Sequence, residues 1–244
     1  FTLEDLKRVA EIGKENNVKT YLTLNTILYD HDITLMKSIV STAKESGVTA
    51  IIAADHAVMN YAKKIGMEIH ISTQANVSNI DTVEFYANYA DVVVLARELS
   101  LMQVADISRE IKRRNITGPS GKLVELEIFA HGALCMAVSG KCYLSLHSHF
   151  ASANRGACIQ NCRRSYVVTD KEDGIEFEVD NEFIMSAKDL CTIDFLDKIL
   201  DAGVSVLKLE GRGRSVDYVH TVTRCYNEAI NAYLEGTYTK EKVI

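Results

Sequence analysis

Residues 50–74 read AIIAADHAVMNYAKKIGMEIHISTQ, and this stretch decides the fold class. It begins with an apolar run over residues 50–54. Residues 57–65 then repeat apolar side chains at helical spacing, and Gly66 is typical of the position just after a helix. A second strand follows over residues 68–71, where isoleucines alternate with Glu68 and His70. A strand, a helix and another strand in this order predict a right-handed βαβ unit with parallel strands.

The same alternation extends over the whole first half of the chain. Predicted strands cover residues 19–24, 50–54, 68–71, 92–95 and 122–130, and predicted helices cover 3–16, 33–46, 57–65, 79–88 and 100–114. The strands are apolar almost throughout, as parallel strands covered on both faces are. Because each strand ends in polar residues, the pattern favours an α/β fold of the TIM-type (β/α) barrel class. A doubly wound open sheet is the alternative, but no glycine-rich phosphate loop follows a strand.

The alternation stops after residue 132. Two strands at 165–169 and 175–179 flank a turn-forming segment and predict a β-hairpin. Further strands are predicted at 183–186 and 204–209, with helices at 193–202 and 216–234. We therefore expect barrel βα units over 1–132, a Cys-rich insertion with the hairpin over 133–182, and the final barrel strands with the C-terminal helix over 183–244. Since a barrel needs eight strands and this sequence begins on a helix, we expect an N-terminally truncated barrel.

Composition narrows the classes of function. The 244 residues include 27 Lys and Arg against 33 Asp and Glu, giving a net charge of −6. This balance argues against a strongly basic nucleic-acid scaffold, although a local basic patch stays possible. There is no apolar run of the roughly 18 residues that a membrane span needs, and no signal pattern at the start. We expect a soluble cytoplasmic protein without a membrane partner.

The six cysteines are the main chemical feature. Their spacing is Cys135-x6-Cys142-x15-Cys158-x3-Cys162, followed by Cys191 and Cys225. In a reducing compartment, clustered thiols hold a metal ion or an iron–sulfur cluster more often than they form disulfides. Zinc is one candidate, with His147 and His149 as possible further ligands. The alternative is that several are small buried hydrophobes, which we expect for Cys225 on the apolar stripe of the last helix.

Polar residues at the predicted strand ends would meet at one end of a barrel. We expect catalytic roles for Gln74, His131, Asp189, Lys208, Glu210 and Arg212, and substrate-binding roles for Asn25, Asp55 and Arg155. Lys208 and Glu210 would face the same way and form a pair, serving either proton transfer or structure. Any of these residues could instead cap a helix or bind a loop amide. Arginines around the cysteines could anchor a phosphate or carboxylate, and Tyr143 and Phe150 could stack a base.

Several segments resemble the peptidase U32 family, the collagenase-like proteases. The likeness begins with Glu127-x-Phe129-x-x-Gly132-Ala133-Leu134-Cys135 and Gly140-x-Cys142-x-Leu144-Ser145. It continues through Ala153-Asn154-Arg155-Gly156-x-Cys158, Ser186-x-Lys188-Asp189-Leu190-Cys191 and Lys208-Leu209-Glu210-Gly211-Arg212, with Ser72-Thr73-Gln74 in the first half.

The resemblance implies an oxygen-independent hydroxylase that carries a 4Fe–4S cluster. It implies cluster ligands at Cys135, Cys142, Cys158 and Cys191, with Cys162 as the rival fourth ligand. The implied substrate is an RNA base in tRNA or rRNA, most specifically a tRNA wobble uridine converted to 5-hydroxyuridine. A small carboxylate such as prephenate is the implied hydroxyl donor.

Two other functions stay open. One is a peptidase in which the cysteines are structural or bind zinc; a dyad of Cys135 and His131 would then supply the nucleophile and its base. Neither a His-Glu-x-x-His helix nor a Gly-x-Ser-x-Gly turn is present in the sequence. The other is an RNA-binding accessory protein in which a cluster only stabilises the fold.

Overall fold

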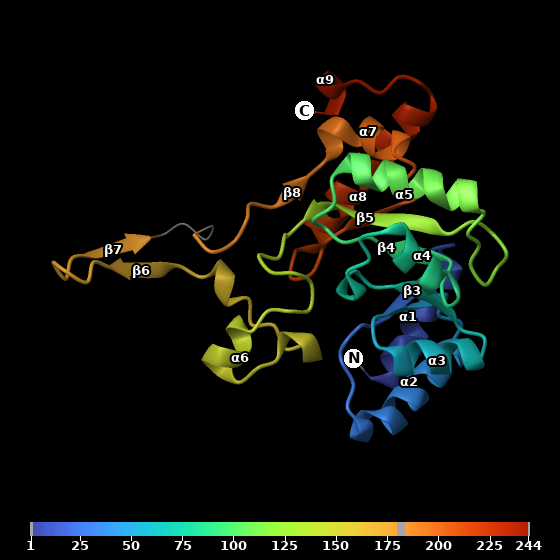
Figure 1. Cartoon of the computed structure of the whole chain (residues 1–244), viewed down its shortest axis with the longest axis horizontal. Coiled ribbons are helices and arrows are strands. Elements are labelled where there is room, and N and C mark those ends of the chain that lie inside the picture. Colours follow the sequence, from blue (N-terminus) through green and yellow to red (C-terminus); the bar gives the residue numbers. More distant parts are fainter. Residues whose placement is uncertain (1, 180–183, 244) are drawn as a thin grey trace. The chain divides into compact units, whose positions relative to one another are not determined.

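The structure, a computed structural model, describes residues 2–179 and 184–243, which divide into two compact units. The first unit holds the chain up to Ile128 together with Ile199–Val206. The second unit holds Phe129–Lys198 and the chain from Leu207 onward. Figure 1 shows the elements along the chain.

The first unit has an α/β fold with a parallel sheet. Each strand lies parallel to the next in the order β1 (Tyr21–Leu24), β2 (Ala50–Ala53), β3 (Glu68–Ile71), β4 (Val92–Val94) and the first part of β5 (Glu125–Gly132). The helices between them are α1 (Leu3–Glu15), α2 (Ile33–Glu45), α3 (His56–Lys64), α4 (Ile80–Ala87) and α5 (Leu101–Arg114), with 3₁₀ turns η1 (Asp30–Asp32) and η2 (Thr73–Ala75). This confirms the predicted βαβ pattern.

Apolar strands and capped helices explain why these elements form. Ile51, Ile69 and Leu126 are fully or almost fully buried, as residues of a sheet covered on both faces are. Thr2 and Asp5 form the capping box that begins α1. The strands run in an open path from β1 to β5, and a closed eight-stranded barrel is not confirmed among the described residues.

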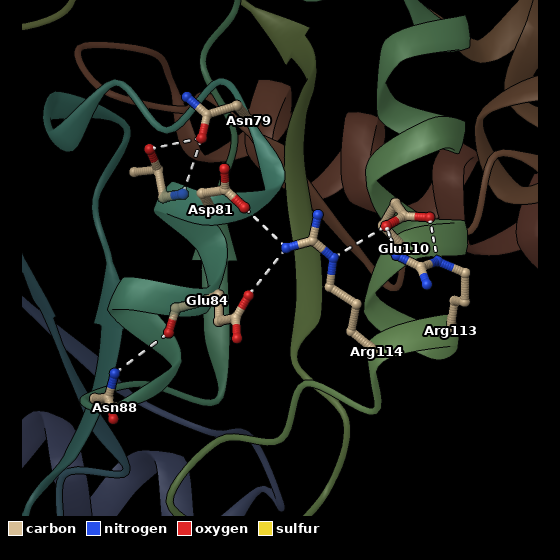
Figure 2. Close-up of polar contacts among 8 residues, drawn as sticks. Asn79, Asp81, Glu84, Asn88, Glu110, Arg113 and Arg114 are labelled. Atoms are coloured by element: carbon tan, nitrogen blue, oxygen red, sulfur yellow. Dashed lines mark hydrogen bonds and ion pairs between the residues drawn. The ribbon is translucent and has the colours of Figure 1, made fainter.

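An arginine joins α4 to α5 on the surface of the first unit (Figure 2). Arg114 donates to Asp81 at 2.8 Å, to Glu84 at 3.1 Å and to Glu110 at 3.0 Å. Arg113 binds the same Glu110 carboxylate through two bonds of 2.7 Å. Hydrogen bonds from Arg113 and then from Arg114 lower the pKa of Glu110 to about 2. Because these groups are solvent-exposed, salt will weaken the network.

The second unit is built on the end of β5. There β8 (Leu190–Cys191) pairs antiparallel with it, placing Cys191 opposite His131, and β9 (Val206–Leu209) also pairs with β5. The predicted hairpin is present as β6 (Tyr166–Thr169) and β7 (Glu176–Val179). The other elements are α6 (Leu144–His149), η3 (Ala153–Arg155), η4 (Asn161–Arg163), η5 (Ile193–Phe195), α8 (Val216–Leu234) and α9 (Lys240–Val243), while α7 (Leu196–Asp201) begins in this unit and ends in the first.

The predicted strand over 183–186 is wrong for the part that the structure describes. Phe183 lies outside the described residues, and residues 184–186 form a bend rather than a strand. The pairing strand is Leu190–Cys191, fixed by Thr192, whose N–H and hydroxyl both donate to the carbonyl of Ala130. The three-part division of the chain stays a prediction. In the part of the chain that the structure describes, no helix has the length and apolar character needed to cross a bilayer.

Candidate functional site

Three of the predicted site residues lie in the first unit, at the ends of β1, β2 and β3. Asn25 donates from Nδ2 to the hydroxyl of Ser72 at 3.2 Å, and the backbone N–H of Gln74 donates to the same hydroxyl at 3.3 Å. Asp55 accepts from the N–H of Ala57 at 2.8 Å as the N-cap of α3, and from Leu28 N–H at 3.0 Å. The structure therefore brings Asn25 and Gln74 together through Ser72, and it gives Asp55 a capping contact.

The second unit places His131 among aromatic side chains. The His131 ring lies 5.6 Å from the ring of Tyr226, edge to face, and 5.9 Å from the ring of Tyr218. Both tyrosines come from α8. The Tyr226 hydroxyl donates to Ala130 O at 2.8 Å and accepts from Thr192 N–H at 3.0 Å, so it holds α8 against the end of β5.

Charged groups surround this histidine. Asp189 forms an ion pair with Arg214 and a longer one, 3.6 Å, with Arg163. The Arg214 guanidinium lies 5.2 Å from the centre of the Tyr218 ring. We call His131, Asp189, Arg214, Tyr218 and Tyr226 the His131 cluster. Arg214 in the cluster and Arg163 beside it carry two positive charges against the single negative charge of Asp189, which suits an anionic ligand.

Burial decides the charge state of His131. It lowers the pKa of the imidazole; the carboxylate of Asp189 acts in the opposite direction, and Arg214 lowers the pKa further. His131 Nδ1 and the Tyr218 hydroxyl are buried, and neither has a hydrogen-bond partner among the described residues. A neutral imidazole with an unpaired nitrogen can accept or donate one hydrogen bond to a bound molecule.

The remaining predicted catalytic residues follow β9. Lys208 lies with Nζ 5.5 Å from the centre of the Phe129 ring, and the expected pair of Lys208 with Glu210 stays a prediction. The N–H of Glu210 donates to His131 O at 2.8 Å, while its carboxylate accepts from the Arg212 N–H at 3.1 Å. The Arg212 residue is exposed. Arg155 is half-buried in η3.

Three cysteines of the second unit act electrostatically on a fourth, Cys162. Burial raises the pKa of the Cys162 thiol, and the thiols of Cys135, Cys158 and Cys142 each raise it further, while Arg163 lowers it. We call these four residues the thiol group. All six cysteines are free thiols. Mutual repulsion of thiolates is the condition that a bound cation relieves, so these side chains fit a metal or an iron–sulfur cluster chemically.

Cys191 has different neighbours. Its thiol interacts with the buried hydroxyl of Tyr226, and it is exposed on β8 opposite His131. The described residues contain no set of three or more His, Cys, Asp or Glu side chains already close enough to hold one metal ion.

Sequence reasoning did not identify three residues of the His131 cluster. Arg214 follows Arg212 in the run Gly211-Arg212-Gly213-Arg214, which is the signal that could have found it. Tyr218 and Tyr226 occur in a regular helical pattern, where tyrosine usually indicates only packing. Asp189 connects the thiol group with the rest of the His131 cluster. It pairs with Arg163, which directly follows Cys162, and with Arg214, which contacts Tyr218.

The family model and the similar proteins of known sequence point to one family. The family model described as "Peptidase family U32" matches residues 1–243. A protein named "Collagenase" from Porphyromonas gingivalis is 58% identical over 243 residues, which are 100% of this chain and 59% of that protein. A "tRNA hydroxylation protein P1" from Bacillus subtilis is 33% identical and covers 96% of this chain and 54% of its own length.

A "23S rRNA 5-hydroxycytidine C2501 synthase" from Escherichia coli is 31% identical over 96% of this chain, which spans 34% of that protein. The chain thus spans between a third and three fifths of the length of these three relatives. A solved structure titled "The Structure of the U32 Peptidase Mk0906" covers 52% of this chain and 52% of its own length, with a TM-score of 0.41 and 14% identity.

Proposed function

Since the chain belongs to peptidase family U32, we propose that it takes part in the oxygen-independent hydroxylation of an RNA base. The most specific form of the proposal is conversion of a tRNA wobble uridine to 5-hydroxyuridine. Relatives named for tRNA and rRNA hydroxylation, at 33% and 31% identity, support RNA as the substrate class. The donor of the hydroxyl group, a small carboxylate such as prephenate, stays a prediction.

One observation carries the proposal. The other three members of the thiol group act electrostatically on Cys162, and the next residue, Arg163, pairs with Asp189, which also pairs with Arg214 of the His131 cluster. A redox group held by thiolates would therefore lie in the same unit as a cationic, histidine-containing binding site. A simple hydrolytic site needs no such combination.

The ligands that we propose are Cys135, Cys142, Cys158 and Cys162. The electrostatic influence of the other three thiols on Cys162 supports it as the fourth ligand, and Cys191 on β8 is its rival. A 4Fe–4S cluster, when bound, supplies one-electron redox chemistry that amino-acid side chains lack.

The His131 cluster would bind and orient the substrate groups. Arg214 and Arg163 neutralise Asp189 and leave donors for an anionic group. His131, kept neutral by burial, offers Nδ1 as the atom that holds or accepts a proton. Gly132, the next residue, brings the backbone of β5 so close to Glu210 that a side chain would not fit there.

Peptidase activity is the second candidate, favoured by the relative named "Collagenase" at 58% identity. A cysteine peptidase needs a base within hydrogen-bond reach of its thiol. Among the described residues, the ring contacts of His131 are with Tyr218 and Tyr226, and its Nδ1 is without a partner. The geometry therefore supports the hydroxylase more than a Cys135–His131 dyad.

Metal analysis tests the cofactor. The chain is purified without oxygen and assayed for iron, acid-labile sulfide and zinc, together with Cys→Ser variants at each position. We expect iron and sulfide in the wild type, and their loss in the variants of Cys135, Cys142, Cys158 and Cys162. The Cys225→Ser variant, on α8, is the control that retains iron.

Two results would contradict this scheme. A colourless protein with stoichiometric zinc overturns the hydroxylase proposal. If Cys162→Ser retains iron and Cys191→Ser loses it, Cys191 is the fourth ligand in place of Cys162, and the hydroxylase proposal stands.

Nucleoside analysis tests the reaction. RNA from cells that lack the corresponding modification is digested and analysed by mass spectrometry after expression of the chain. We expect 5-hydroxyuridine to appear with the wild type and to be lost in His131→Ala. Cleavage of a denatured collagen by the wild type without any change in RNA nucleosides would favour the peptidase.

A further inference from the structure

The segment over residues 133–165 has an unusual charge composition. It contains no Asp or Glu, in a chain that has 33 of them, while it carries Lys141, Arg155, Arg163 and Arg164. The whole segment belongs to the second unit and includes the thiol group. A local positive surface in an acidic protein is the electrostatic condition for binding a polyanion.

Two of these cations are available to a ligand. Lys141 and Arg164 are exposed and form no ion pair with any residue in 2–179 or 184–243. Arg163, by contrast, is paired with Asp189. Lys141 and Arg164 can therefore contact phosphate oxygens without first giving up a protein partner.

Exposed aromatic rings accompany the cations. Tyr143 and Phe150 flank α6, and their exposed fractions are 69% and 92%. Phe150 also has a φ of 53°, in the left-handed region that favours glycine. A large apolar side chain in an unfavourable backbone conformation, with almost all of its surface in water, contributes nothing to the folded unit itself.

Hydrogen bonds attach α6 to the cysteine segment. The hydroxyl of Ser145 accepts from the N–H of Ile159 at 3.0 Å. Asn161, between Cys158 and Cys162, donates from Nδ2 to the hydroxyl of Ser148 and lies 3.3 Å from Nδ1 of His149. The helix that Tyr143 and Phe150 flank is thus attached to the segment that carries Cys158 and Cys162.

We propose that Tyr143 and Phe150 stack on the bases of single-stranded RNA, whose phosphates contact Lys141 and Arg164. Aromatic stacking combined with a cationic groove is the general mode of single-strand binding, because every base presents a π face. The inference rests on the proposed function, for which it names the surface that receives the RNA. It assigns to these residues binding, not catalysis.

The β6–β7 hairpin of the same unit provides the contrast. Its exposed apolar side chains, Val168 at 44% and Phe177 at 57%, lie among Glu176, Glu178 and the acidic turn over 170–173. Carboxylates repel RNA, so this hairpin does not fit the same ligand. Phe177 and Lys171 are therefore matched controls for an aromatic ring and for a cation.

Fluorescence anisotropy measures the binding. The full chain, purified without oxygen, is titrated against a labelled mixed-sequence RNA of about 12 nucleotides, a length within the range of single-stranded sites. We expect Tyr143→Ala and Phe150→Gly each to weaken binding by roughly 5- to 150-fold, as the loss of one stacked base does. Phe177→Ala should bind like the wild type, and a duplex of the same sequence should bind more weakly.

The choice of glycine at residue 150 separates binding from folding. Glycine adopts the left-handed conformation without strain, so Phe150→Gly should melt at the wild-type temperature or above it. A loss of RNA binding in a variant of equal or higher stability cannot come from unfolding.

The salt dependence of binding tests the two cations. For single strands, each phosphate contact contributes about 0.7 to the slope of log K against log salt. We expect Lys141→Gln and Arg164→Gln each to reduce this slope by about that amount. Lys171→Gln, on the acidic hairpin turn, should leave the slope unchanged.

The outcomes distinguish this inference from the proposed function. If the wild type forms 5-hydroxyuridine while Tyr143→Ala and Phe150→Gly bind RNA normally, the inference is wrong and the function stands. If both variants lose RNA binding but the wild type modifies no RNA, the surface is correct and the reaction is wrong. Equal weakening by Phe177→Ala, or binding of an acidic protein in place of RNA, also overturns the inference.

Discussion

Tyr226→Phe should destabilise the protein and Tyr218→Phe should not, although both tyrosines lie on α8 and both rings contact His131. Tyr226 is 2% exposed, and its hydroxyl donates to Ala130 O and accepts from Thr192 N–H. The Tyr218 hydroxyl is buried without a partner among the described residues. The pair therefore compares a satisfied hydroxyl with an unsatisfied one in a single helix.

The structure sets the magnitude for Tyr226→Phe. Two hydrogen bonds and a longer contact of 3.3 Å with the Thr192 hydroxyl are lost, but neither partner is left alone, because Thr192 also donates to Ala130 O from its N–H at 3.2 Å and its hydroxyl at 2.9 Å. The cost is then the net value of two bonds, about 1–2 kcal/mol, without the added penalty of an orphaned group. For a protein of this size that lowers the melting temperature by roughly 2–8 °C.

Tyr218→Phe removes a polar atom that burial has separated from water. Its replacement should leave the free energy of unfolding unchanged or raise it by up to about 1 kcal/mol. The ring that contacts His131 and Arg214 is retained.

Thermal melting and urea titration measure both variants, and hydrogen exchange of the Thr192 amide reports the local effect. We expect faster exchange of this amide in Tyr226→Phe alone. The reasoning is refuted if Tyr218→Phe destabilises the protein as much as Tyr226→Phe, since its hydroxyl would then have a partner in solution.

Three further predictions follow from single contacts. Gly132→Ala should severely destabilise the second unit, because the φ of Gly132 is 110° and an added Cβ would lie 2.6 Å from both Cβ and O of Glu210. The control is Gly174→Ala, where φ is 68° and no atom lies within 4 Å of the added Cβ. It should lower the melting temperature only slightly. His131→Asn should reduce the loss of stability in acid. Burial lowers the pKa of His131 below its ordinary 6.5, so the protein is fully stable above pH 6.5 and loses stability as the pH falls through the pKa of the folded state. Melting curves from about pH 7.5 to about pH 5 will show this. Glu110→Gln should flatten the pH dependence of stability at lower pH. The Glu110 carboxylate, with a pKa of about 2 in the folded protein, contributes stability above its ordinary pKa of 4.5, and this contribution is lost as the pH falls through 2. Acid titration at low and high salt checks this.

The fold of the first unit was predictable because its signals are local. Its strands are short and rich in apolar residues, as in β2 and β4, and four of its five helices begin at a residue whose side chain caps them, such as Thr2 for α1. β8 was not predictable for the opposite reason. It has only two residues, too few for any periodicity, and its position depends on Thr192 binding Ala130 O, 62 residues earlier in the chain.

The site was predictable in its residue types but not in its grouping. Cysteine spacing identified the thiols, whereas only the folded chain shows Cys162 among three others and Cys191 beside Tyr226. Tyr226 itself has no sequence signal. Its role depends on a carbonyl acceptor 96 residues away, a relation that helical periodicity does not contain.

The absence of carboxylates from residues 133–165 bears on both the proposed thiolate ligation and the proposed RNA binding. Thiolates and phosphates are both anions, so a carboxylate among them would repel each of them. A segment that gathers four thiols therefore benefits from cations, and Arg163 already lowers the pKa of Cys162. Lys141 and Arg164 are then free to face outward without opposing charges nearby in sequence. One compositional constraint accordingly favours both thiolate ligation inside the segment and RNA binding on its surface.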